Sequence, residues 1–178
     1  MRQYWVAPLP PFHIADGAAY ANLATLTDVS PAPSIVIPAN LLEQGSRLEF
    51  YAFGRYSNTG TPTLTIGVYY GTGAISAGMA ICATSALTTV TTVTNRTWRL
   101  EGHATVRAVG ASTSGSILGI AEISNVTTNG TDLAPATAPT ALACDTTVAN
   151  KLMVGATWGA ANAANTLTCH YFGVRLVN

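Results

Sequence analysis

The sequence predicts an all-β protein, an antiparallel β-sandwich of about eight strands. Apolar and polar side chains alternate with a period of two in several segments, and clusters of turn-forming residues separate these segments. No long stretch has the 3.6-residue period of an amphipathic helix. The length of 178 residues suits one domain with its own core. We therefore predict a single sandwich or barrel domain over residues 17–178, preceded by an arm.

The clearest predicted strands span 47–56, 63–70, 98–108 and 151–158. In the third of these, Trp98 and Leu100 belong to an apolar side, whereas Arg99 and Glu101 belong to a side that faces water. Weaker strand signals fall at 34–37, 86–94, 116–123 and 165–176. A helix is the less favoured interpretation of 18–26, because that segment is short, uncapped and followed by a turn sequence.

One predicted strand, 47–56, is apolar on both faces. Leu48 and Phe50 form one side, and Tyr51 and Phe53 lie among charged residues on the other. A strand with two apolar faces is covered on both, either by loops of its own chain or by a neighbouring subunit.

A late segment, 125–147, shows no clear period. It is rich in Thr, Ala and Pro, a composition typical of irregular structure. We predict a long surface loop there.

Residues 1–16 form the predicted arm, because they combine aromatic residues with three prolines. Proline favours an extended backbone and cannot donate to a sheet ladder. Exposed aromatic rings would be a liability, so the arm is expected to pack on its own domain or on a neighbouring molecule, and both interpretations stay open. Its aromatic and proline residues are Tyr4, Trp5, Pro8, Pro10, Pro11 and Phe12.

The chain is unusually poor in charge. Only 9% of its residues are charged, and eight basic side chains balance eight acidic ones, whereas soluble domains carry about 25%. Binding to nucleic acids or to anionic membranes needs clusters of Lys and Arg, which are absent, so we expect neither partner. No apolar run approaches the roughly 18 residues of a membrane span, and the N-terminus lacks the apolar core of a signal peptide.

No catalytic, cofactor or metal motif stands out, and we expect no enzyme activity. The histidines His13, His103 and His170 lie in separate segments, and no G-x-S-x-G motif occurs. The cysteines are odd in number and lack CxxC spacing, which favours free thiols. They are Cys82, Cys144 and Cys169.

One pair of carboxylates needs a separate explanation. Glu49 and Glu101 could face each other across a groove, as the two acids of a glycosidase do. Each has an arginine two residues away, Arg47 or Arg99. Ion pairs on the same strand face are the simpler interpretation.

Several short runs resemble a group of small structural proteins encoded by tailed bacteriophages. These runs are LTDVSPAP (26–33), IPAN (37–40), GSRL (45–48), SNTGTPTL (57–64), WRLE (98–101), DTT (145–147), VGATWG (154–159) and NTLTC (165–169). They spread over nearly the whole chain and lie at expected turns and strand starts.

The resemblance implies a jelly-roll β-sandwich that lies on the virion as a capsid decoration or cement protein. Such a protein would form homotrimers on the outside of the head and bind the major capsid protein. It would be made in the cytoplasm of the host bacterium. The arm residues Tyr4, Trp5, Pro8, Pro10, Pro11 and Phe12 are then the expected capsid anchor. The expected subunit interface contains Tyr51, Phe53, Arg55 and Tyr69.

An alternative interpretation keeps the virion but moves the protein to the tail tip or a fibre, where it would bind carbohydrate on the host surface. Tyr51, Phe53 and Arg55, or Tyr69 with Asn58, could then supply an aromatic and polar platform for sugar rings.

Overall fold

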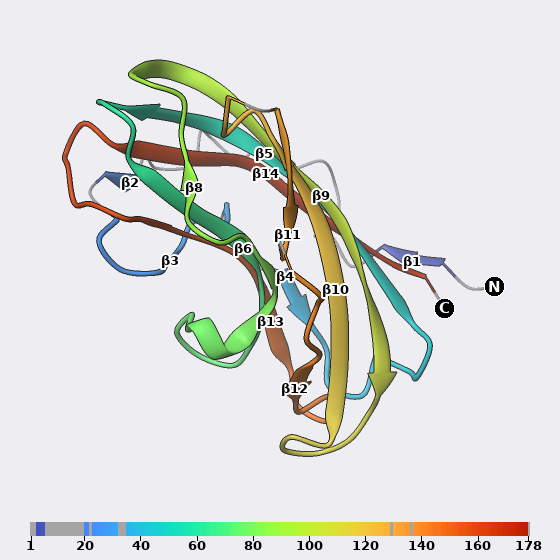
Figure 1. Ribbon diagram of the computed structural model, residues 1–178. Coiled ribbons are helices and arrows are strands. Elements are labelled where there is room, and N and C mark those ends of the chain that lie inside the picture. Colours follow the sequence, from blue (N-terminus) through green and yellow to red (C-terminus); the bar gives the residue numbers. More distant parts are fainter. Residues whose placement is uncertain are drawn as a thin grey trace.

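The protein is an all-β sandwich, as predicted (Figure 1). A computed structural model describes residues 3–5, 20–21, 23–31, 35–128, 130–135 and 137–177. In these residues the chain forms fourteen strands and a single turn of 3₁₀-helix, η1 (Ala77–Met79). The strands make two antiparallel sheets that enclose one hydrophobic core.

The larger sheet has eight strands. Six of them follow one another in the order β1 (Gln3–Trp5), β14 (Thr166–Val177), β5 (Arg47–Asn58), β9 (Val93–Ala108), β10 (Gly115–Ser124) and β11 (Thr131–Ala134). The other two strands add short pairings: β2 (Tyr20–Ala21) pairs with β14, and β12 (Leu142–Cys144) pairs with β10.

The smaller sheet has six strands. Its main order is β3 (Thr27–Asp28), β13 (Asn150–Trp158), β6 (Thr63–Gly71) and β7 (Ala80–Ala83). Alongside these, β4 (Ile35–Ile37) pairs with β13, and β8 (Leu87–Thr88) pairs with β6. In both sheets a late strand lies between earlier ones: β14 separates β1 from β5, and β13 separates β3 from β6.

The core lies between the sheets and is anchored by large aromatic side chains. Trp98 is 1% exposed, and its indole nitrogen donates a hydrogen bond to the Thr168 carbonyl oxygen at 3.1 Å. Gly54 makes this contact possible, because a Cβ at that position would lie 1.8 Å from the same oxygen. Tyr56 and Trp158 add a tilted ring pair with centroids 6.2 Å apart.

The predicted segments contain every long strand and two of the short ones, β4 and β8. Eight of the fourteen strands fall in the predicted segments, and the other six are only two to four residues long. The loop predicted at 125–147 was wrong, because it contains β11 and β12. Their inward side chains, Ala134, Leu142 and Cys144, are buried, but strands this short cannot show a period.

The predicted arm is only partly described. Gln3–Trp5 forms β1, which pairs with Arg175–Val177 at the C-terminal end of β14, so the two ends of the chain lie side by side (Figure 1). For these residues the backbone packs on its own domain. Pro8, Pro10, Pro11 and Phe12 lie outside the described residues, as do the side chains of Tyr4 and Trp5.

Candidate interaction surface

Three neighbouring strands, β14, β5 and β9, bring the predicted interface residues onto the outer face of the larger sheet. Phe53 on β5 lies opposite Tyr171 on β14 and Arg99 on β9. Tyr51, two residues earlier, lies opposite Gly173 and Glu101. Because side chains two residues apart share a face, these groups stand together on the side away from the core.

Tyr171 reaches this face through a β-bulge. Cys169 points into the core, so a regular strand would place Tyr171 on the core side as well. The register of β14 against β5 shifts between Cys169 and Tyr171, and the extra residue turns the Tyr171 ring outward. Sequence reasoning missed Tyr171 because alternation alone gives no sign of a bulge.

Tyr51, Phe53 and Tyr171 form an aromatic cluster in which Tyr51 is half-buried and the other two residues are exposed. Their ring centroids lie 5.6–6.1 Å apart, and the Phe53 and Tyr171 rings are stacked at an interplanar angle of 16°. Phe53 and Tyr171 are each 41% exposed. The guanidinium of Arg99 lies over the Tyr51 ring, 5.1 Å from its centroid, in a cation–π arrangement.

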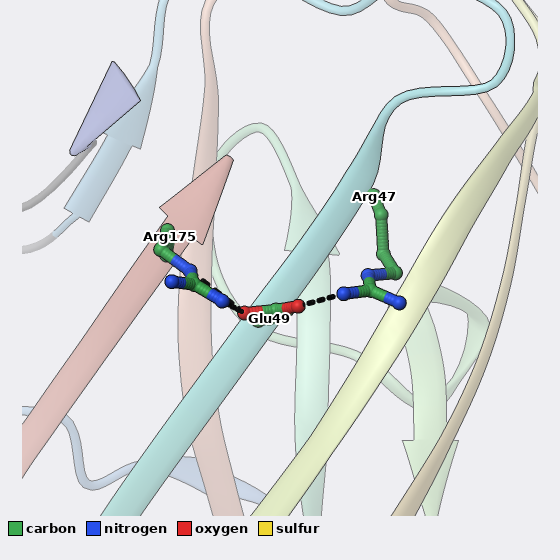
Figure 2. A network of polar contacts seen from close by, with 3 residues as sticks. All are labelled: Arg47, Glu49 and Arg175. Atoms are coloured by element: carbon green, nitrogen blue, oxygen red, sulfur yellow. Dashed lines mark hydrogen bonds and ion pairs between the residues drawn. The ribbon is translucent and has the colours of Figure 1, made fainter. Parts of the chain in front are cut away.

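Glu49 is held between two arginines from two strands, Arg47 of β5 and Arg175 of β14 (Figure 2). The Arg175 Nε atom donates to a Glu49 carboxylate oxygen at 2.7 Å. Partial burial raises the pKa of Glu49, but hydrogen bonds from Arg175 and Arg47 outweigh it and place the pKa below its usual value. The carboxylate is therefore ionised at neutral pH.

A second ion pair joins Arg99 to Glu101 on β9. The prediction that Glu49 and Glu101 pair with arginines on their own strands is therefore confirmed. The outer face combines exposed aromatic rings with charges that are partly neutralised within the chain.

A hollow of about 960 Å³ adjoins the aromatic cluster on the same face. Residues of β5, β9, β10, β11 and β14 line it, among them Tyr51, Glu101, His103, Glu122, Leu133 and Arg175. Its volume lies within the range of small-molecule pockets, and charged side chains of both signs stand among the apolar groups of its walls.

Tyr69 does not join this surface. It lies on the outer face of the smaller sheet and is 2% exposed, because the connection from β6 to β7 covers that face. The ring packs against Gly155, as does the Ile75 side chain from the connection. Asn58 is also buried and donates to the Thr89 hydroxyl at 2.8 Å, so Tyr69 and Asn58 form no exposed sugar platform.

Arg55 lies on the outer face of the larger sheet, as predicted, next to the aromatic cluster. It sits two residues beyond Phe53 on β5 and is exposed. Its neighbours across the strands are Thr168 and Thr97.

The cysteines are free and buried, and burial raises their thiol pKa values, to about 12 for Cys82 and Cys169 and about 11 for Cys144. They stay protonated at neutral pH and are poor nucleophiles. Within the part of the chain that is described, no group of three or more His, Cys, Asp or Glu side chains could hold a metal ion.

His103 lies on the outer face opposite Glu49, and His170 lies at the bulge of β14. His13 is outside the described residues. The described helical structure amounts to one three-residue turn, and no helix there could cross a membrane.

Comparison with family models, curated proteins and solved structures found no match.

Proposed function

We propose that the chain is a bacteriophage capsid decoration protein, which binds the outside of the assembled head as a homotrimer and stabilises contacts between major capsid proteins. The observation that carries the proposal is the exposed aromatic cluster of Tyr51, Phe53 and Tyr171 in the middle of a sheet face. A large exposed apolar group at such a place marks a surface that another molecule covers. This role needs no catalysis.

A decoration protein acts by mass action. Because it binds the assembled shell and not free capsid subunits, every bound copy shifts the equilibrium towards the shell. The low charge of the chain supports this role, since a surface with few charges loses little hydration when it is covered.

We assign jelly-roll connectivity to the sandwich. Strands that come late in the chain lie between early ones in both sheets, with β14 between β1 and β5 and β13 between β3 and β6. This return of a later strand beside an early one is the feature of Greek-key folds, and two Greek keys make a jelly roll.

The proline-rich part of the arm is the proposed capsid anchor. β1, which precedes the proline-rich part in the sequence, is the outermost strand on its side of the larger sheet. Deleting residues 1–16 would also remove β1 from the sheet, and a fair test must keep this strand. The variant P10G/P11G/F12A changes three of the expected anchor residues and leaves the sequence of β1 intact.

Co-sedimentation with expanded phage heads tests both parts of the proposal. Wild-type protein is expected to pellet with heads, and the P10G/P11G/F12A variant is expected to stay in the supernatant. Undiminished binding by the variant would reject the arm as anchor. Wild-type protein that never pellets with heads would reject the decoration role itself.

A second candidate is a tail-tip or fibre protein that binds host-surface carbohydrate. The hollow beside Tyr51 favours it, because sugar rings stack on aromatic side chains and bond to nearby charged groups. Copy number separates the two: gel densitometry of purified virions should show hundreds of copies for a decoration protein and a handful for a tail protein.

A further inference from the structure

We infer that the outer face of the larger sheet is the surface through which copies of this chain associate, with Tyr51, Phe53 and Tyr171 at the centre of the contact. The expected number of three copies rests on the proposed function. The contact itself follows from the position of the rings and from the charges on this face.

The aromatic cluster lies on interior strands. β14 and β5 have a neighbour on each side in the larger sheet, so a partner cannot reach the rings by adding a strand at an edge. It must lie over the face. Tyr, Phe and Arg are enriched at the centres of protein interfaces, and the cluster consists of these residue types with Arg99 over the Tyr51 ring.

The charges nearest to the rings would not prevent burial. Glu49 is already paired with Arg47 and Arg175, and Arg99 with Glu101. Burying a charge is strongly unfavourable when it has no partner. These groups are already paired within the chain and would stay paired when the face is buried.

The remaining charges favour a second copy as the occupant. Within the described residues, Arg55, Arg107 and Glu122 on this face make no ion pair. Glu122 also lies directly opposite Glu101 on β9, an unfavourable arrangement of like charges. An arginine from a neighbouring copy would relieve it.

The whole face carries charges of both signs, with five arginines and three glutamates at outward positions of its strands. They are Arg47, Arg55, Arg99, Arg107 and Arg175, and Glu49, Glu101 and Glu122. Because the two signs are interspersed, an arginine on the face of one copy can lie against a glutamate on the face of its neighbour. A nucleic acid would need a face with one sign of charge.

The test is the mass of the full-length protein in solution, measured by light scattering after size-exclusion chromatography. The wild type is expected at three times the chain mass of 18.4 kDa. Tyr171→Asp and Phe53→Asp should each give a folded protein of one chain mass, because a carboxylate would be buried among the rings. Val36→Asp is the matched control, since Val36 is 47% exposed on the smaller sheet and should keep the wild-type mass.

The double variant F53A/Y171A covers the case in which the Asp variants do not fold. Truncating two central rings should weaken association by at least about tenfold, measured by sedimentation equilibrium. A wild type that stays a single chain at micromolar concentration would overturn the inference. So would folded Asp variants that keep the wild-type mass.

Two results keep this test separate from that of the proposed function. A single-chain protein that still pellets with phage heads would overturn the self-association and leave the decoration role standing. A single-chain protein that binds neutral oligosaccharides on a glycan array, and loses that binding in F53A, would assign the face to sugar instead.

Discussion

Both sheets of this sandwich carry aromatic rings on their outer faces, but the rings of the two sheets differ in how far the chain itself covers them. On the smaller sheet, the eight-residue connection between β6 and β7 folds over Tyr69 and leaves it 2% exposed. On the larger sheet, β5 leads through a tight turn directly into β6, and the rings of Phe53 and Tyr171 stay 41% exposed.

The comparison shows that an aromatic residue on the outer side of a strand does not reveal what covers that side in the folded protein. β5 and β6 each carry an aromatic residue on the outer side, Phe53 and Tyr69, and the connections that follow the two strands differ. Where that connection is long and carries apolar residues such as Ile75 and Met79, the chain covers itself. Where it is short, the rings on the outer face stay exposed.

The largest expected difference between the two faces is in stability. Tyr69→Ala should lower the free energy of unfolding by about 3–5 kcal/mol, because it removes a fully packed ring and leaves a cavity. Tyr171→Ala, measured in dissociated protein, should cost less, about 1 kcal/mol, because the residue is 41% exposed at the surface and its loss opens no cavity in the core. Urea unfolding, followed by fluorescence of the buried Trp98 and Trp158, measures both. Equal losses would remove the distinction between the faces.

A smaller effect tests the cover over Tyr69. A Cβ on Gly155 would lie 2.4 Å from the Ile75 side chain and 2.6 Å from the Tyr69 ring, so Gly155→Ala should force the cover outward. We expect a loss of about 1–3 kcal/mol in thermal or urea unfolding. Gly78→Ala is the control, because no atom lies within 4 Å of the position that its Cβ would occupy, and it should change little.

The smallest effect concerns Glu49 on the larger sheet. Its pKa in the folded protein lies below the ordinary 4.5, so its charge stabilises the fold above that pH and loses this effect as pH falls through the folded pKa. Glu49→Gln should therefore cost up to about 1 kcal/mol at neutral pH and nothing in strong acid. Urea unfolding at both pH values measures it, and a difference that grows in acid would contradict the assignment.

Much of this structure could be predicted from the sequence, because regular alternation marks long strands and their ion pairs. Segment 98–108 became part of β9 with Arg99 and Glu101 paired on its outer face, as predicted. The bulge that exposes Tyr171 could not be predicted, since one extra residue changes the face of a side chain without changing composition. The connection that covers Tyr69 follows β6 directly, but its Ile75 side chain packs against Gly155 of β13, and no local pattern encodes that distant contact.

The most direct test of the central claim is hydroxyl-radical footprinting of the full-length protein across a dilution series, read by mass spectrometry. Tyr69 should be protected at every concentration, because its own chain covers it. The peptides with Phe53 and Tyr171 should be protected in concentrated protein and become oxidised as copies dissociate. Strong oxidation of Phe53 and Tyr171 at all concentrations would contradict the claim that other copies cover the larger sheet.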